Sequence, residues 1–328
     1  MLLAVCSLLY AAATFGGLSR ADIAVVINTR DALSRQIGDY YAAQRHIPRS
    51  NIAKVAFDDS RDDLSRADFL RLKVAVDRQL KSHPRAYALT WARPYRVECM
   101  SITSAFALGF DAKYCADGCQ PTGKNPYFNA SDSPVRDDPT MSLAMSVAAK
   151  DLQTAKALID RGVRSDGTSP QGTAYLIRTQ DPQRNIRSLE YPLAVRVAEH
   201  EFDFHITLQA DSTPAGDAMF YFVGAASPSL SAIHFLPGAV ADHLTSFGGM
   251  LTDSPQMSSL RWLEAGATGS YGTVVEPCNL LQKFPHVPVL LAHYLAGETL
   301  VEAYWKSVEM PGQGIFIGEP LAAPFKRR

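Results

Sequence analysis

The 328-residue sequence lacks the features that mark several large classes of protein. It has almost no net charge, with 32 Lys and Arg against 33 Asp and Glu, and no basic stripe, so we expect no nucleic-acid partner. It has no repeat at a fixed period and no low-complexity tract, which argues against a solenoid and against disorder. Beyond the N-terminus it has no run of about 20 apolar residues, so no membrane span is expected in the mature chain. Hydrophobic residues make up 47% of the chain, enough for a substantial core.

The first 21 residues, MLLAVCSLLYAAATFGGLSRA, have the pattern of a secretory signal peptide. The apolar stretch is too short for a membrane span, and Ser19 and Ala21 provide the small residues that precede a cleavage site. We therefore predict cleavage before Asp22 and export to the periplasm or the cell exterior. The segment has no positively charged start, and a buried first helix is the alternative.

Few cysteines are present, and four remain after a signal peptide is removed. In an oxidising compartment an even number favours disulfides. Cys115 and Cys119 flank the turn-forming Asp117-Gly118, so we expect them to bond to each other, which leaves Cys99 for Cys278. Sequence alone leaves all three connectivities open. No C-x-x-C pair is present, so we expect no zinc or other metal site at the cysteines. We also expect no cofactor.

Apolar, β-branched runs alternate with segments of helical periodicity along most of the chain. Strands are predicted at 22–28, 51–57, 86–91, 172–179, 217–225, 236–246, 268–278 and 314–324. Helices are predicted at 31–48, 65–84, 151–167, 185–202, 254–267 and 287–308. The alternation predicts an α/β fold with a largely parallel sheet and flanking helices. We expect residues 22–328 to form a single domain, with an irregular, disulfide-linked insertion at about 93–139.

Three segments near the C-terminus carry a resemblance: GATGSYGTVVEP (266–277), GETLVEAYWKSV (297–308) and IFIGEPLAAP (315–324). They resemble the closing part of gingipain-type cysteine peptidases and their caspase-like relatives, with Gly318-Glu319-Pro320 in place of a Gly-Asp-Pro-like turn. From Asp22 onward the chain more closely resembles an uncharacterised secreted bacterial family that occurs in species with exosortase sorting systems. The matching stretches include INTRD (27–31), IGDYYAAQRHIP (37–48) and PGAVADHLTSFGG (237–249). The resemblance implies a caspase-like or gingipain-like arrangement of the sheet.

The residues that a gingipain-like peptidase needs are not carried over. Such an enzyme has His-Gly at one strand end and a nucleophilic Cys at the next, where this chain has Val223-Gly224 and then His243 to Ser246. Ordinary cysteine-peptidase activity is therefore not expected.

A rearranged centre is an alternative. His243 could pair with Cys278 or Ser246, and Asp242 or Glu276 could orient the imidazole ring. Thr245 and Trp91 would then help to bind a ligand in the same cleft. The competing interpretations are a disulfide for Cys278, a hydrogen-bonded strand-end histidine for His243, and a turn hydroxyl for Ser246.

Three functional hypotheses follow. The one we favour is a secreted, degenerate gingipain-like protein that binds a peptide or cell-envelope component at the strand ends. The second is a hydrolase with a rearranged Cys/His or Ser/His centre. The third is a structural envelope protein whose loops are held by disulfides.

Overall fold

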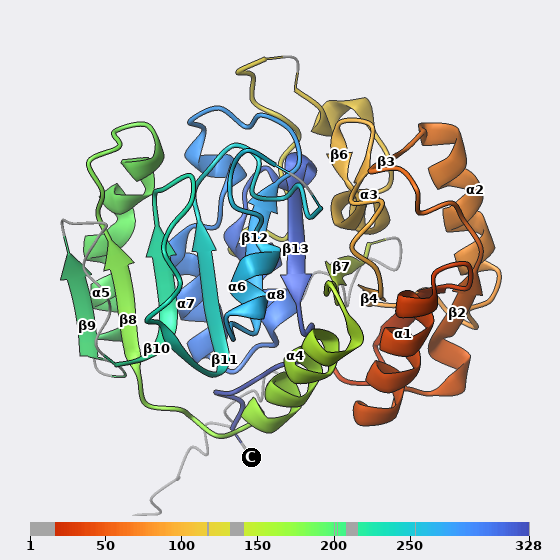
Figure 1. Ribbon diagram of the computed structural model, residues 1–328, viewed down its shortest axis with the longest axis horizontal. Coiled ribbons are helices and arrows are strands. Elements are labelled where there is room, and N and C mark those ends of the chain that lie inside the picture. Colours follow the sequence, from red (N-terminus) through yellow and green to blue (C-terminus); the bar gives the residue numbers. More distant parts are fainter. Residues whose placement is uncertain are drawn as a thin grey trace, which may run out of the picture.

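A ten-stranded sheet runs through the computed structural model, which describes residues 17–116, 118–131, 141–199, 201, 203–207, 216–252 and 254–327 (Figure 1). From one edge to the other the strands are β2 (Ile52–Val55), β1 (Ile23–Asn28), β4 (Ala86–Leu89), β7 (Leu143–Ser146), β13 (Gly314–Gly318), β12 (Gly269–Thr273), β11 (His234–His243), β10 (Asp217–Val223), β8 (Thr173–Ile177) and β9 (Asp203–Thr207).

The strands form two groups of five that run in opposite directions. From β2 to β13 every neighbouring pair is parallel, and from β12 to β9 every neighbouring pair is parallel too. The groups meet at the antiparallel pair β12–β13, and Figure 1 shows β13 pointing against β11. The strands of one group therefore have their carboxyl ends on the side of the sheet where the strands of the other group have their amino ends.

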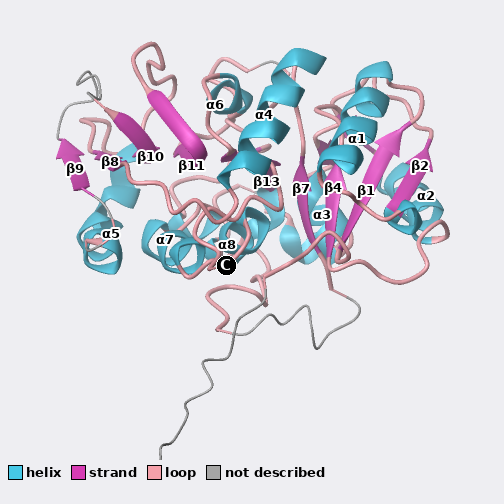
Figure 2. Ribbon diagram, turned by 90° about the horizontal axis from the view of Figure 1, so that it is seen from below, coloured by secondary structure: helices cyan, strands magenta, loops and turns pink. Residues whose placement is uncertain are grey.

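Helices cover both faces of the sheet, which confirms the predicted α/β class. Figure 2 shows α1 (Ala32–Gln44), α4 (Leu152–Ser165) and α6 (Leu260–Glu264) on one face. The other face carries α2 (Arg66–Asp77), α3 (Ile102–Leu108), α5 (Tyr191–Ala198), α7 (Val287–Leu295) and α8 (Leu300–Ser307). Strands covered on both sides read as continuous apolar runs, and every residue of β1 is buried. In the ranges that the structure describes, no helix combines the length and apolar character that crossing a membrane requires.

The segment expected to be irregular from residue 93 is more regular than its composition indicates. It contains β5 (Arg96–Val97), β6 (Met100–Ser101), helix α3 and the 3-10 turn η2 (Ala112–Tyr114). With β3 (Asp63–Leu64), β5 and β6 form a small second sheet. Helix α3 is buried, and its apolar residues join the core. Its Ser104 hydroxyl is also buried and donates to the carbonyl of Pro311 at 2.6 Å. Residues 132–140 lie outside the described part.

The disulfide pairing expected from the turn is wrong. Cys99 bonds to Cys115, and Cys119 bonds to Cys278, with Cα–Cα distances of 5.5 and 5.4 Å. The reason is that Cys115 and Cys119 face different elements. Cys99, between β5 and β6, lies against the end of η2, whereas the chain beyond Gly118 reaches the turn that follows β12.

The structure also contains strands that the prediction lacks, among them β7 and β9, and one helix begins later than predicted. Strand β7 is absent from the prediction, because its sequence LAMS lacks the β-branched residues that indicate a strand. The helix expected from Ser254 begins only at Leu260. Residues 254–259 form bends and a turn instead, and their backbone bonds to neighbouring loops: Met257 N–H donates to Ala226 O, and Ser259 N–H donates to Gly248 O.

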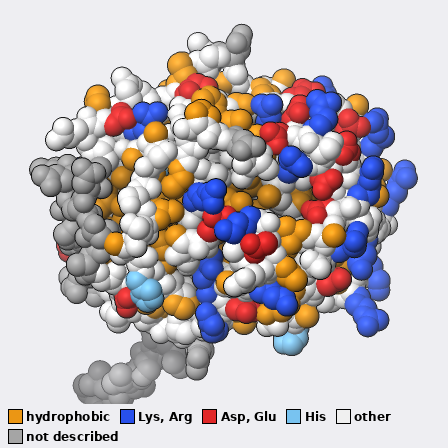
Figure 3. All heavy atoms as spheres, in the orientation of Figure 1, with side chains coloured by type: hydrophobic (Ala, Val, Ile, Leu, Met, Phe, Trp, Pro, Cys, Tyr) orange, Lys and Arg blue, Asp and Glu red, His pale blue; other side chains and the backbone are white. Residues whose placement is uncertain are grey.

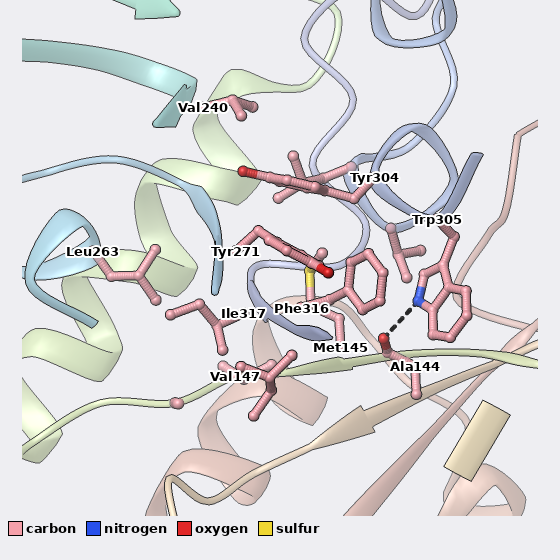
Figure 4. Packing of buried hydrophobic residues seen from close by; sticks show 14 of the residues in the cluster. Ala144, Met145, Val147, Val240, Leu263, Tyr271, Tyr304, Trp305, Phe316 and Ile317 are labelled. Atoms are coloured by element: carbon pink, nitrogen blue, oxygen red, sulfur yellow. Dashed lines mark hydrogen bonds between the residues drawn. The ribbon is translucent and has the colours of Figure 1, made fainter. Parts of the chain in front are cut away.

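An aromatic cluster packs the junction between the two strand groups (Figure 4). Trp305 of α8 stacks on Phe316 of β13 with ring centroids 4.4 Å apart, and its indole N–H donates to the carbonyl of Ala144 in β7 at 2.8 Å. Tyr271 of β12 meets the ring of Phe316 edge-on at 5.1 Å. One indole thus joins helix α8, the last strand and the strand beside it.

The residues just before the predicted cleavage site pack into the fold. Leu18 is 2% exposed, and its N–H donates to Glu302 Oε2 at 3.0 Å. Glu302 also accepts from Thr299 in the capping box that begins α8. Cleavage before Asp22 would remove the Leu18 contacts, whereas cleavage upstream of Gly17 would keep them. Residues 1–16 lie outside the described part.

We predict that a chain starting at Asp22 is about 2–4 kcal/mol less stable to unfolding than one starting at Gly17, because a buried leucine and a hydrogen bond to a carboxylate are lost. Urea denaturation of the two purified chains measures the difference. In the longer chain, Leu18→Met should retain most of the stability. Equal unfolding midpoints for the two chains would show that Leu18 is not part of the core.

Candidate functional site

The strand ends expected to hold a catalytic pair are side by side. Strands β10 and β11 are parallel neighbours, and Val223 is paired in register with His243. Strand β12 lies next to β11, and the Thr273 hydroxyl at its end donates to the carbonyl of Ser246 at 2.8 Å. These strands therefore end on the same side of the sheet, and the loops after β11 and β12 are in contact.

His243 is enclosed and both of its ring nitrogens are bonded. Nδ1 accepts a hydrogen bond from the Trp262 indole at 2.8 Å, and Nε2 lies 3.0 Å from the carbonyl of Met257. Because the indole can only donate and the carbonyl can only accept, the proton must sit on Nε2. Burial lowers the pKa of His243 to about 3, against the weaker opposing effect of the Met257 hydrogen bond. The imidazole is therefore neutral, and neither nitrogen is left to receive a proton from a nucleophile.

Asp242 does not orient this ring. Its carboxylate lies 2.5 Å from Arg187 Nη1, and both side chains are 1% exposed. Arg187 belongs to the 3-10 helix η4 (Arg184–Glu190) and also lies over the ring of Phe222. Burial raises the pKa of Asp242, although Arg187 opposes the shift. The two residues form a buried ion pair on the face of β11 that η4 covers.

Thr245 and the main chain of Ser246 hold the loop after β11. The Thr245 hydroxyl donates to Gln256 Oε1 at 2.7 Å and accepts from Arg184 Nε at 3.2 Å. The same Gln256 oxygen accepts the N–H of Phe247 at 2.8 Å. These bonds fix the loop conformation.

The place where the resembled family has its His-Gly is closed by η4. A side chain at Gly224 would collide with the carbonyl of Arg184, and the Thr179 hydroxyl donates to the carbonyl of Gly224 at 2.7 Å. Only glycine fits this close approach of two backbones. The segment thus covers the strand end instead of leaving it open.

Cys278 and Glu276 lie in the turn after β12. Cys278 is bonded to Cys119, so its sulfur is not a free thiol, and its backbone N–H donates to Glu276 Oε1 at 2.8 Å. Glu276 is exposed. Neither residue bonds to the ring of His243, because Trp262 and Met257 hold both nitrogens. The thiol–imidazole pair of the alternative, rearranged centre does not form, and Cys278 is in a disulfide, although its partner is Cys119 and not Cys99.

A cavity of about 390 Å³ lies at the carboxyl ends of the other strand group. The chain passes from β1 to β2 on one side and then to β4 on the other, so the strand order reverses between β1 and β4. Ligands of open α/β sheets bind at such a reversal. Asp31 follows β1, Thr90 to Arg93 follow β4, and Ala149-Lys150 follow β7; all of them line the cavity. We take this cavity as the candidate site.

The cavity combines apolar walls with charges of both signs. Leu33 and Ile37 of α1 form one wall, and Leu260 of α6 lies in the other. Glu264 of α6 pairs with Arg261 at 2.7 Å and lies 3.7 Å from Lys150. Figure 3 shows Lys and Arg intermixed with Asp and Glu on this face of the molecule, without a broad patch of one sign.

Trp91 is the one predicted site residue that lines this cavity. It is 2% exposed, its indole donates to the carbonyl of Pro94 at 3.1 Å, and it meets Phe57 edge-on at 4.9 Å. It is thus a fixed wall, and its role in binding stays a prediction. The sequence analysis missed Asp31, Lys150, Arg261 and Glu264. Asp31 has a signal, because it is the N-cap that directly follows the first strand.

We predict that His243→Gln removes a pH-dependent part of the stability. The pKa of His243 is about 3 in the folded chain and ~6.5 in the unfolded chain, so between these values the unfolded chain binds more protons. Folding stability therefore falls as the pH falls through this range, by up to about 1.4 kcal/mol per pH unit. Gln keeps a donor and an acceptor but does not titrate there.

Urea denaturation at pH 7, 5.5 and 4.5 measures this slope, which should be shallower in His243→Gln than in the original chain. His46→Asn is the control, because His46 is exposed and Asn tolerates its positive φ of 51°. Equal slopes for the original chain and His243→Gln would mean that His243 is not held neutral.

Comparisons with known proteins add little to this geometry. No protein-family model matches the chain, and no curated protein matches it. A solved structure described as "Structure of Protease" is similar over 94% of this chain and 80% of its own, with 10% sequence identity and a TM-score of 0.47. Likeness this distant carries no argument about activity or ligand.

Proposed function

We propose that this is an exported, non-enzymatic binding protein that holds a short peptide segment in the cavity at the ends of β1, β4 and β7. The observation that carries the proposal is the cavity itself, which lies where the strand order reverses between β1 and β4 and joins apolar walls to charges of both signs. A peptide presents the same combination, an apolar side chain beside a charged terminus.

The state of the expected catalytic residues supports binding over hydrolysis. A His243–Cys278 centre would need the Cys119–Cys278 bond to be reduced and His243 to leave both Trp262 and Met257. A Ser246 centre would need the same release of His243. A base with a pKa of about 3 accepts protons too weakly for general-base catalysis near neutral pH.

The cavity walls suggest how a peptide would lie. Asp31 is on the α1 side, where its carboxylate accepts the N–H of Leu33 and caps the helix. Lys150 and Arg261 are on the α6 side and share Glu264. A bound peptide would direct its ammonium group toward Asp31 and its carboxylate toward Lys150 and Arg261, with an apolar side chain against Trp91.

Export is supported by the disulfides. Both bonds persist only in an oxidising compartment, which agrees with the signal-peptide pattern of the first 21 residues. An exported binding protein would meet peptides and the termini of envelope proteins.

Binding of free tripeptides with a central leucine tests the proposal, using saturation-transfer NMR and calorimetry. Ala149→Leu adds bulk to the cavity wall, and we expect it to weaken binding about tenfold or more, as overfilling a packed site does. Lys150→Ala should weaken binding less, and should act only on peptides with a free carboxylate. Capping both peptide termini should reduce binding to the original chain.

Leu189→Ala is the control variant, because Leu189 is 82% exposed and does not line the cavity. Thermal melts of each variant check that the fold is intact. Binding that Ala149→Leu leaves unchanged would place the ligand elsewhere. Cleaved peptides in mass spectra would favour the hydrolase hypothesis, and no binding by any peptide would favour the structural one.

A further inference from the structure

Strand β2 has one unpaired side. It is the last strand of the sheet order, and among the strands that the structure describes it pairs with β1 alone. The carbonyl of Val55 accepts the N–H of Thr29 at 2.7 Å, so Val55 faces β1. Backbone groups alternate in direction along a strand, so those of Lys54 and Ala56 face outward. An outward-facing edge is a template on which another strand can pair.

A side-chain amide already pairs with part of this edge. Lys54 N–H donates to Gln79 Oε1 at 2.9 Å, and Gln79 Nε2 donates to the carbonyl of Lys54 at 2.8 Å. The carboxamide of Gln79 carries the same donor and acceptor as a peptide group. Gln79 therefore makes the two hydrogen bonds that a residue of an added strand would make. It comes just after α2 and is exposed.

A groove of about 880 Å³ runs beside this edge. We call it the β2–α2 groove and define it by Lys54 and Ala56 on the strand side, Leu72 and Ala75 on the helix side, and Gln79 at one end. Leu72 is 6% exposed and forms part of the floor, whereas Ala75 is exposed and small. Within the described residues, no group bonds to the backbone of Ala56.

The charges along the groove are largely balanced. Arg61 pairs with Asp63 at 3.4 Å, and Arg71 pairs with Asp68. All four line the groove. A bound segment would therefore interact mainly with the outward-facing backbone groups of β2, to which any extended peptide can form hydrogen bonds.

We propose that the β2–α2 groove binds an extended segment of a partner protein by strand addition to β2, with Gln79 as the group that the segment displaces. The added strand would take over the hydrogen bonds of Lys54 and make new ones to Ala56. This surface is separate from the cavity at the ends of β1, β4 and β7, and the proposal does not depend on that cavity.

The walls of the groove favour a single strand over a second copy of this chain. If two copies of the chain paired through β2, the space beside β2 would have to be open enough to admit the whole sheet of the second copy. Here α2 and residues 61–65 lie across from β2 and line the other wall. A lone extended segment fits between the walls, as in other cases of β-strand addition.

The probe is a fluorescein-labelled peptide, acetyl-Lys-Thr-Val-Thr-Ala-Thr-Val-Lys-amide, and the readout is fluorescence anisotropy with the intact chain. We expect Gln79→Ala to bind it about fivefold more tightly than the original chain, because two hydrogen bonds no longer have to be broken first. Ala75→Phe fills the groove and should abolish binding. Val74→Phe is the matched control, since Val74 is on the same helix, exposed and outside the groove.

A second probe separates backbone pairing from side-chain contact. The same peptide with alternate residues N-methylated keeps its side chains but loses the donors of one edge, so we expect no binding. Equal binding of the methylated probe would overturn the proposal, as would binding that survives Ala75→Phe or no binding even to Gln79→Ala. A dimer of Gln79→Ala in size-exclusion chromatography, lost on adding Ala75→Phe, would show that a second copy is the occupant and would overturn it too.

Discussion

The position of β13 is the constraint on which the rest of the structure depends. This strand is the last in the chain and lies in the middle of the sheet, where it joins the two strand groups. It pairs along its whole length with β12 but at only one position, Ile317 with Ser146, with β7. The bond from Trp305 to the carbonyl of Ala144 strengthens that narrow join. Glu319, directly after the strand, forms a buried ion pair with Arg45, the residue that follows α1.

Because the two strand groups run in opposite directions, the molecule has two sets of carboxyl strand ends. One set is covered by the chain, and the other borders a cavity. At the ends of β10 and β11 the chain covers the sheet itself: η4 lies over Gly224, and Gln256 links Thr245 to Phe247. At the ends of β1, β4 and β7 a cavity remains between α1 and α6, and no comparable segment in the described ranges fills it. The strand order also reverses between β8 and β10, so the reversal alone does not explain the difference; there η4 lies against the strand ends and fills the space.

The sequence predicted the class of fold well and the candidate site poorly, for a physical reason in each case. Strands such as β1 and β10 are apolar at all but one position each, Asn28 and Asp217, so the local pattern is enough to find them. Strand β7 owes its conformation to its neighbours, which its small residues do not reveal. The cavity depends on strand order and on a loop from the far half of the chain, neither of which has a local signal. Of its residues only Trp91 was anticipated, as an aromatic beside a strand end. The predicted disulfide pairing was wrong for a similar reason, because Cys119 bonds to a cysteine 159 residues away in the sequence.

Polar residues at a strand end can be catalytic, or they can be structural groups that bond within the protein. His243 and Asp242 are structural, which their sequence pattern does not reveal. Catalytic groups keep a lone pair or proton available for substrate, whereas buried structural groups must use theirs within the protein. His243 uses both nitrogens, and Asp242 faces a guanidinium. Side chains on consecutive strand residues point to opposite faces, so the two contribute to different layers: His243 to the α6 side through Trp262, and Asp242 to the α5 side through η4. The polar cluster in the sequence is therefore two separate anchors, each of which fixes one layer of the fold to β11.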